Sequence, residues 1–369
     1  MKHRVEKVFA LLDPKPDALV IANAVDPHLD LSFFYLFDVP AGLFEGAVAV
    51  ARPDGELDVL TSPLEAETAF EAAKHDPHVK VQVVNRGDDT EAAVKKLLPS
   101  SGTYALNNRE LTHDWFLHFE KLLPEAKWTD ASNAIRRARA TKEPHEIELL
   151  RRAAEIGSDV GREIPGLLRT GITELELAAE MEYRMGRHGA SGRSFSTIVA
   201  FGPHGAEPHY SPHDTRLKPG DSIVCDFGAY YRRYASDITR SFHFGPRDEE
   251  MKEVHETVLA AQNAALEAIR PGVPGKEVHN AAARVIDASR WKGRLTHGVG
   301  HSIGLVVHDG WGYGPNVDDP LEVGMAITVE PGIYLPGHGG VRIEDDIVVT
   351  KDGYEFLTTA PRGYIEVPS

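Results

Sequence analysis

Cysteine is almost absent from this 369-residue chain: Cys225 is the only one, so no internal disulfide bond can form. A chain held together without disulfides suits a reducing compartment. No 18 apolar residues follow one another, and only five consecutive apolar residues precede Asp13. The first absence argues against a membrane-spanning helix, and the second argues against a secretory signal. We therefore expect a cytoplasmic protein without a membrane partner.

Basic residues are also scarce, with 40 Lys and Arg against 56 Asp and Glu, and the formal net charge is −16. The sequence contains no basic cluster, and this argues against nucleic acid or an anionic surface as a partner. Apolar residues make up 42% of the chain, which is ordinary for a globular protein with a sizeable core. The length predicts two or three domains.

Residues 1–135 are predicted to form a smaller α/β domain with a mixed sheet. Short runs rich in valine and alanine predict strands at 18–25, 46–51, 57–62 and 79–84. Helical patterns lie around 63–74, 90–98 and 112–122. The domain has no cluster of metal ligands and no phosphate-binding glycine loop. We expect it to support or shape a site, which could belong to a neighbouring subunit.

Residues 136–369 are predicted to form an α+β domain in which one pattern of elements occurs twice. Pro144 suits the first turn of a helix, and Thr173 and Glu176 have the spacing of a capping box. Two helices and then a strand-rich segment are expected in each half: 144–161, 174–186 and 195–244, then 248–269, 276–289 and 297–350. Such a pseudo-two-fold repeat would place side chains of both halves at a shared seam.

Two glutamates flank a strong turn cluster in the second strand-rich segment. Gly337 lies inside the cluster at 336–340, midway between Glu330 and Glu344. In a symmetric hairpin these two carboxylates would lie opposite each other on one face. Like charges repel there, so the arrangement favours a cation between them.

Two aspartates show the same pattern in the first strand-rich segment. Asp226 interrupts an apolar strand, and the midpoint between Asp226 and Asp237 lies between Tyr231 and Arg232. A symmetric hairpin would therefore place these aspartates opposite each other as well. Buried carboxylates on core strands are unfavourable unless they are paired or bind metal. The alternative is four unrelated acids in ordinary ion pairs, which the recurrence on two hairpins disfavours.

Three histidines lie in a glycine-rich segment between the two carboxylate hairpins, at His297, His301 and His308. One is interpreted as a metal ligand and the others as catalytic groups beside it, although a lone histidine is more often a core residue. Four carboxylates and one imidazole favour manganese, cobalt, zinc or iron over metals that prefer thiolates. A pair of such ions can generate hydroxide from water near neutral pH and polarise a carbonyl, so a hydrolase is predicted.

At these residues the chain resembles the M24-type metallopeptidases of the pita-bread fold, which include methionine aminopeptidase, aminopeptidase P and prolidase. The resemblance covers about 140–369, in the motifs TIVAFGPHGAEPHY, DFGAYYRRYASDITRSF, HGVGHSIGLVVHD, EPGIY and GGVRIEDD. The preceding α/β domain resembles, more weakly, the amino-terminal domain of creatinase and of the proline-specific members. Because methionine aminopeptidases usually lack that domain, the proline-specific branch is favoured.

This resemblance implies a C-terminal pita-bread domain that holds two divalent metal ions, with manganese expected ahead of cobalt, zinc or iron. Asp226 would chelate one metal, and Asp237 and Glu344 would bridge both. His301 and Glu330 would hold the second metal. A bridging water, deprotonated on the metals, would attack the carbonyl before proline, with Glu330 as the proton acceptor.

The same resemblance implies roles for further side chains around the metals. His308 would stabilise the developing oxyanion. His209 and His297 would line the proline side and assist the leaving nitrogen and the carboxylate. Tyr334 and Arg342 match positions close to the metals. Arg342 would either pair with a ligand carboxylate or contact the substrate.

The substrate implied by the resemblance is a small peptide with proline in second position, and the implied assembly is a homodimer. Many prolidases hold the free carboxylate of a dipeptide with an arginine four residues after the histidine that matches His308. This chain has Gly312 there, and the segment HDGWGYG is closer to the aminopeptidase P pattern. The short chain and compact first domain instead match many prolidases. An Xaa-Pro dipeptidase is therefore favoured, with aminopeptidase P, which acts on longer peptides, as the alternative.

Other classes of protein share this fold. Members that lack the metal ligands act as metal-free amidinohydrolases such as creatinase, or as non-catalytic interaction modules, and five intact ligand positions argue against both. A metal-dependent lyase or cyclic-amide hydrolase of a small non-peptide substrate is a further alternative, because one fold hosts different chemistries.

Overall fold

The computed structural model describes residues 1–85, 87–310 and 314–369. The chain divides into two compact units, Met1–Arg139 and Ala140–Ser369. Gly312, where the sequence lacks the prolidase-type arginine, lies outside the described residues. No helix in the described part of the chain is both long enough and apolar enough to cross a membrane.

The N-terminal unit consists of a sheet and the helices that pack around it. The strands are β1 Ala18–Ala22, β2 Val48–Ala51, β3 Leu57–Thr61, β4 Val79–Val83, β5 Thr103–Leu106 and β6 Lys127–Asp130. The helices are α1 Lys2–Phe9, α2 Leu31–Phe37, α3 Ala66–Ala73, α4 Asp88–Leu97, α5 His113–Leu122 and α6 Ser132–Ala140.

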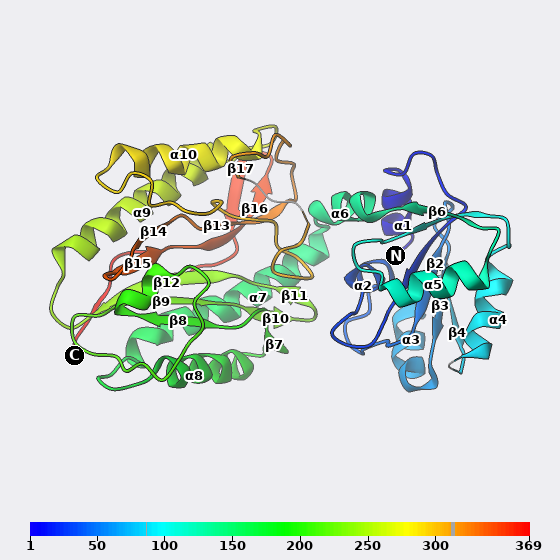
Figure 1. The fold of residues 1–369 in the computed structure, drawn as a ribbon, viewed down its shortest axis with the longest axis horizontal. Coiled ribbons are helices and arrows are strands. Elements are labelled where there is room, and N and C mark those ends of the chain that lie inside the picture. Colours follow the sequence, from blue (N-terminus) through cyan, green and yellow to red (C-terminus); the bar gives the residue numbers. More distant parts are fainter. Residues whose placement is uncertain (86, 311–313) are drawn as a thin grey trace. The chain divides into compact units, whose positions relative to one another are not determined.

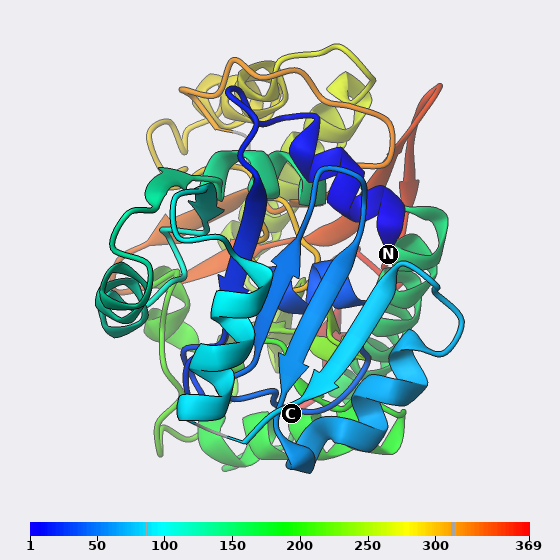
Figure 2. The same ribbon diagram turned by 90° about the vertical axis from the view of Figure 1, so that its right-hand side faces the viewer.

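The six strands form one sheet in the order β4-β3-β2-β1-β5-β6. Strand β1 pairs antiparallel with β2 and parallel with β5, so the expected mixed sheet is confirmed. Figure 2 shows β1 to β4 side by side. The four strands and three helices expected from the sequence are present. Helices α1, α2 and α6 and strands β5 and β6 were not predicted.

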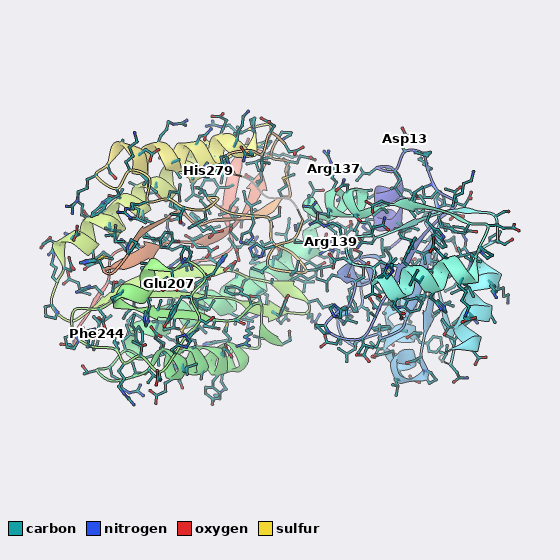
Figure 3. All side chains as sticks on the ribbon, viewed as in Figure 1. Asp13, Arg137, Arg139, Glu207, Phe244 and His279 are labelled. Atoms are coloured by element: carbon teal, nitrogen blue, oxygen red, sulfur yellow. The ribbon has the colours of Figure 1, made fainter. Side chains whose placement is uncertain are left out.

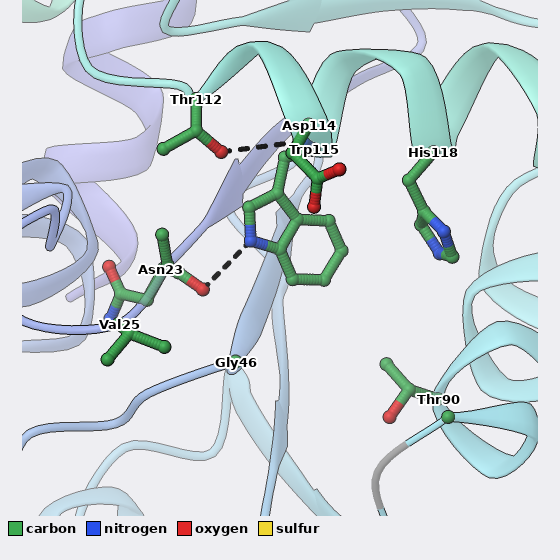
Figure 4. Close-up of a pocket in the computed structure, with 10 residues that line it drawn as sticks. Asn23, Val25, Gly46, Thr90, Thr112, Asp114, Trp115 and His118 are labelled. Carbon is green, nitrogen blue, oxygen red and sulfur yellow. Dashed lines mark hydrogen bonds between the residues drawn. The ribbon is translucent and has the colours of Figure 1, made fainter.

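A cavity of about 320 Å³ lies in the N-terminal unit beside the start of α5. The indole Nε1–H of Trp115 donates a hydrogen bond to the carbonyl oxygen of Asn23 at 3.1 Å, and Thr112 caps the helix (Figure 4). Within residues 1–85 and 87–139, no group of three or more His, Cys, Asp or Glu side chains is arranged to hold a metal ion. The group of possible metal ligands in the described residues lies in the C-terminal unit.

The C-terminal unit contains two helix pairs, each followed by strands. The first half comprises α7 Pro144–Glu163, α8 Glu174–Arg187, β7 Gly192–Arg193, β8 Ile198–Phe201, β9 Ser222–Phe227, β10 Ala229–Tyr231, β11 Tyr234–Ala235 and β12 Ile238–Phe244. The second half comprises α9 Glu249–Ala268, α10 Gly275–Ala288, β13 Ala326–Val329, β14 Gly332–Leu335, β15 Gly339–Arg342, β16 Asp345–Thr350, β17 Gly353–Phe356 and β18 Glu366–Val367.

This order of elements confirms the predicted repeat. The capping box of Thr173 and Glu176 starts α8, as the sequence indicates. Figure 1 shows α9 and α10 along one side of the strands and α8 along the other. Strand β12 pairs with β9 in one sheet, and β13 pairs with β16 in another. The apolar faces of the helices are buried against these strands.

The hairpin that carries the two glutamates has the predicted register. Strand β13 pairs Val329 with Asp345, and β14 pairs Gly332 with Arg342. Glu330 and Glu344 lie between these two ladders, in the register that sets them opposite each other. The hairpin is centred on Gly337, as the turn cluster at 336–340 predicted.

The expected register of the two aspartates is wrong: the partner of Asp226 is two positions further along the chain than Asp237. Tyr231 pairs with Tyr234 and Asp226 pairs with Thr239, so Asp226 does not face Asp237. The cause is a two-residue turn centred on Arg232 and Arg233, whose φ angles are 45° and 73°. Arginine is an unusual residue for positive φ, and the sequence therefore did not mark the position of this turn.

The two halves meet at a buried ion pair. Arg240 on β12 donates to a carboxylate oxygen of Asp345 at 2.6 Å and to the carbonyl oxygen of Glu344 at 2.5 Å. Gln262 on α9 donates to the other oxygen of Asp345 at 2.9 Å. Arg240 and Asp345 are 3% and 1% exposed, and Asp345 has one further cation nearby, the Arg362 guanidinium, whose Nε lies 3.9 Å from its second oxygen.

We predict that Arg240→Met lowers the free energy of unfolding of the C-terminal unit by about 3–5 kcal/mol, because the buried Asp345 charge loses its nearest cation and keeps only the more distant Arg362. Urea unfolding monitored by circular dichroism measures the loss. The matched control is Arg193→Met, which breaks an ion pair with Glu182 that is 50% and 32% exposed. The control should cost at most about 1 kcal/mol. Equal losses in the two variants would contradict the assignment of the seam to this pair.

Candidate metal centre

A cavity of about 790 Å³ opens in the C-terminal unit. Its lining contains all five side chains predicted as metal ligands: Asp226, Asp237, His301, Glu330 and Glu344. The lining also contains four of the side chains predicted to surround the metals: His209, His297, His308 and Arg342. The fold therefore brings together predicted metal ligands that are up to 118 positions apart in the chain, from Asp226 to Glu344.

The donor atoms of the predicted ligands are close enough to share cations. Asp237, His301 and Glu344 each offer an atom within 4.8 Å of the other two. The Nε2 atom of His301 is 3.6 Å from a carboxylate oxygen of Asp237 and 3.5 Å from one of Glu330. Burial raises the pKa of Asp237 most, and the nearby carboxylates of Glu344 and then Asp226 raise it further. Asp226 is therefore close enough to Asp237 for their charges to interact.

Breaks in the strand ladders place three of the four carboxylates at the cavity. Asp237 lies between β11 and β12, and Glu330 and Glu344 lie between the two ladders of the second half. Gly228 follows Asp226 on the facing strand, where an added Cβ would lie 1.8 Å from the carbonyl oxygen of Ser236. Glycine is therefore required at position 228 for the backbone beside Asp237 to approach so closely.

Backbone contacts hold His301 beside β13. The backbone N–H of His301 donates to the hydroxyl of Thr328 at 3.1 Å, and the N–H of Thr328 donates to the carbonyl of His301 at 2.8 Å. The N–H of Glu330 donates to the carbonyl of Val299 at 2.8 Å. The glycine-rich segment thus runs along the strand that leads into Glu330 and carries its histidine to the same cavity.

Burial and mutual repulsion make this group of acids unfavourable when all are ionised. Burial, followed by the neighbouring carboxylates, raises the pKa of Asp237 and of Glu344 well above its usual range. Burial raises the pKa of Glu330 to about 8. Four acids so placed require positive charge before they can ionise together at neutral pH.

The residues present fit divalent metal ions. One carboxylate oxygen of Asp226 and one of Asp237 are buried and have no hydrogen-bond partner among the described residues. His301 donates its Nδ1–H to the carbonyl of Ser302 at 3.2 Å, which leaves the Nε2 lone pair directed to the acids. Burial lowers the pKa of His301 to about 3, so the ring is neutral and able to ligate.

Arg342 links one predicted ligand to two other side chains. Its guanidinium donates to Asp226 at 2.5 Å, to the hydroxyl of Tyr334 at 3.0 Å and to the hydroxyl of Thr239 at 3.1 Å. The residue is 3% exposed. Of the two roles considered from the sequence, this geometry favours pairing with a ligand carboxylate over contact with substrate.

Thr239 is a site residue that sequence reasoning missed. Its hydroxyl donates to a carboxylate oxygen of Glu344 at 2.6 Å and accepts from Arg342. The hydroxyl therefore fixes which oxygen of Glu344 remains free to face the cavity. The residue follows Asp237 by two positions, but a threonine on an apolar strand is too common to mark a site by itself.

His297 in the cavity lining is hydrogen-bonded to Tyr334, which is buried and is not part of the lining. The Nδ1–H of His297 donates to the carbonyl of Gly298 at 2.7 Å, and its Nε2 accepts from the hydroxyl of Tyr334 at 2.7 Å. Burial lowers the pKa of His297 to about 4, in keeping with a neutral ring. Both ring nitrogens are thus occupied, and the ring holds the Tyr334 hydroxyl toward Arg342.

His308 and His209 are the two exposed histidines of the cavity lining. The His308 ring is centred 4.1 Å from that of His301. Burial, followed by His209, lowers the pKa of His308, so its ring is neutral and carries one N–H donor. Both histidines are exposed and line the cavity, where a bound molecule could reach them.

A buried glutamate outside the cavity, also missed from the sequence, anchors the loop that carries His209. Glu174 is 0% exposed and accepts from the backbone N–H groups of Phe201 and His213 at 2.9 and 3.1 Å. It also binds the His204 ring at 2.9 Å and the Tyr210 hydroxyl at 2.8 Å. These four contacts fasten both ends of the loop to the first turn of α8.

Comparison with known proteins agrees with this geometry. Residues 148–351 match metallopeptidase family M24, and residues 11–141 match the creatinase/prolidase N-terminal domain. This chain belongs to metallopeptidase family M24. The M24 resemblance drawn from the sequence and the pita-bread fold that it implied are confirmed. Enzymes of family M24 use divalent metals, which agrees with the donor set of the cavity.

Several relatives in family M24 are similar over much of the chain. An uncharacterized peptidase of Staphylococcus aureus (strain USA300) is 39% identical over 229 residues, which cover 62% of this chain and 65% of that protein. An Xaa-Pro dipeptidase from Bacillus anthracis is 30% identical, with a TM-score of 0.90 over 99% of both chains. An X-Pro aminopeptidase from Thermotoga maritima MSB8 is 33% identical, with a TM-score of 0.89 over 99% of this chain and 100% of that one.

We predict that Asp237→Asn raises the melting temperature of the metal-free M24 protein by a few degrees, because it removes one of several repelling buried charges. The same variant should lose most of the further rise that manganese gives to the unsubstituted chain, because it loses a ligand. Differential scanning calorimetry with and without manganese measures both effects.

The matched control is Asp221→Asn. Asp221 is also buried, but its carboxylate accepts from the backbone N–H of Lys218 and pairs with the Lys218 ammonium at 3.3 Å. This control should not stabilise the metal-free protein and should keep the manganese response. A destabilised Asp237→Asn variant that still responds to manganese would contradict the site.

Proposed function

We propose that this chain hydrolyses the peptide bond that precedes proline in small peptides, using two divalent metal ions. The observation that carries the proposal is the convergence of five donor side chains from both halves on one open cavity. The names of the similar structures, an Xaa-Pro dipeptidase and an X-Pro aminopeptidase, support the choice of substrate.

In this proposal Asp226 would hold one ion, His301 and Glu330 would hold the other, and Asp237 and Glu344 would contribute ligands to both. When bound, such ions lower the pKa of a coordinated water toward neutrality and polarise the carbonyl that is attacked. The Arg240–Asp345 ion pair and the strand pairs on either side of Glu330 and Glu344 hold these side chains in position before the substrate binds.

The chain's own groups move the protons and stabilise the developing charge. Glu330 takes the proton of the attacking water on a carboxylate oxygen, for which bound cations must first keep that carboxylate ionised. The N–H of His308 donates to the oxygen that becomes negative. His209 faces the proline and its leaving nitrogen from the anchored loop. His297 and Arg342 hold the Tyr334 hydroxyl in place.

Two lengths of substrate remain candidates. The compact first domain, which resembles that of many prolidases, favours Xaa-Pro dipeptides. One structural observation favours longer peptides: Arg342 is the only arginine or lysine among the described residues of the cavity lining, and its guanidinium is committed to Asp226, Tyr334 and Thr239. A free carboxylate directly after proline therefore lacks an uncommitted cationic partner within the described lining.

The direct test is hydrolysis of Ala-Pro, Ala-Pro-Ala and Ala-Ala-Ala by the full chain with manganese added. We expect cleavage before proline in the first two peptides and little in the third. A chelator should abolish turnover, and manganese should restore it. Equal cleavage of the peptide without proline, or full activity in the chelated protein, would overturn the proposal. The ratio of kcat/KM between the first two peptides decides between the dipeptidase and the aminopeptidase.

We predict that Asp237→Ala and Glu344→Ala each lower kcat/KM by at least about 10³-fold, or roughly 4 kcal/mol of transition-state stabilisation, because each removes a group that contacts both ions. The fold should persist, as circular dichroism would show. The control Asp221→Asn should retain activity, because its carboxylate lies outside the cavity lining. Substantial turnover in either alanine variant would count against the proposed mechanism.

A further inference from the structure

Glu207 places a negative charge on the wall of the cavity away from the predicted metal ligands. The side chain is exposed and lines the cavity. Its carboxylate has no hydrogen bond or ion pair with another described residue, and its backbone N–H donates to the carbonyl of His204 at 3.0 Å. Figure 3 shows it among the side chains of the C-terminal unit. The other four acids of the lining are the predicted ligands, so Glu207 is left to face whatever enters.

The position of Glu207 is defined because its loop is anchored on both sides. Glu174 holds Phe201 and His204 before it and Tyr210 and His213 after it. The rings of His204 and Tyr210 also stack, with centroids 4.5 Å apart. The carboxylate of Glu207 is therefore carried on a fixed segment rather than on a free end.

Backbone geometry places Glu207 beside His209. Glu207 and His209 belong to one β-turn, which the backbone N–H of Tyr210 closes by donating to the carbonyl oxygen of Glu207 at 3.2 Å. Only Pro208 separates the two residues. Both residues line the cavity. Because the proposed function sets His209 on the proline side of the substrate, the neighbouring Glu207 is the acid of the lining available to the residue after proline.

We propose that Glu207 determines specificity: it favours peptides with a cationic side chain after proline and disfavours an acidic side chain or a free carboxylate there. This specificity rests on the proposed Xaa-Pro hydrolysis. The charge balance of the wall supports it, because the one guanidinium of the described lining is already paired with Asp226. A lysine or arginine at that position would supply the opposite charge that the Glu207 carboxylate lacks.

The test compares Ala-Pro-Lys-NH2 with Ala-Pro-Glu-NH2, both amidated so that no terminal carboxylate contributes. For the manganese-loaded chain, kcat/KM should be roughly 5- to 10-fold higher with lysine than with glutamate, as expected for a partly exposed charge pair. Glu207→Gln should bring the ratio close to one, and Glu207→Lys should invert it. Added salt should shrink the ratio in the unsubstituted chain, because exposed charges are screened.

The matched control is Glu267→Gln, which removes one negative charge from an exposed position on α9 outside the cavity lining. It should keep the lysine preference of the unsubstituted chain. Binding of the dipeptides Pro-Lys and Pro-Glu, measured by calorimetry, gives a second readout that does not depend on turnover, and it should show the same preference and the same loss in Glu207→Gln.

Three outcomes would overturn the inference. Equal ratios in the unsubstituted chain and Glu207→Gln would remove Glu207 from specificity while leaving Xaa-Pro hydrolysis intact. A charge preference confined to the residue before proline, seen with Lys-Pro-Ala-NH2 against Glu-Pro-Ala-NH2, would place Glu207 at the other end of the substrate. No cleavage of any of these peptides would overturn the proposed function itself, and the specificity with it.

Discussion

Four carboxylates buried in one cavity repel each other, and the organisation of the C-terminal unit follows from that constraint. The acids come from two hairpins whose ladders are interrupted where three of them lie, so their side chains reach the cavity instead of the core. Burial and mutual repulsion raise the pKa of Asp237, Glu330 and Glu344. These acids can all be ionised at neutral pH only when cations balance their charge. The neutral His301 ring supplies a nitrogen donor beside the four carboxylates.

Fixed contacts around the acids explain how the arrangement survives in the folded chain. Arg240 and Asp345 join the two halves through a buried ion pair directly behind Glu344. Arg342 donates to Asp226, and Thr239 donates to Glu344, so each of these two carboxylates has a fixed hydrogen-bond donor. Rotation of the carboxylates is therefore limited before any ion binds, and preorganisation of this kind is what favours a charged transition state.

Strand register could be predicted from the sequence only where turn-forming residues marked the centre of a hairpin. The Gly-rich turn at 336–340 marked the centre of one hairpin, so the register of Glu330 and Glu344 could be predicted. The turn at Arg232 and Arg233 carries no glycine or asparagine, and the register of Asp226 was displaced. The elements of the repeat were predictable from periodicity, whereas contacts such as Thr239 with Glu344, 105 residues apart, depend on tertiary packing that periodicity does not contain.

The most direct measurement of the central claim is anomalous X-ray diffraction at the manganese edge from crystals grown with manganese. We predict two anomalous peaks inside the cavity, about 3.5–4 Å apart. One should contact Asp226, the other should contact His301 and Glu330, and both should contact Asp237 and Glu344. Strong manganese peaks elsewhere in the crystal, with none among these five side chains, would contradict the account.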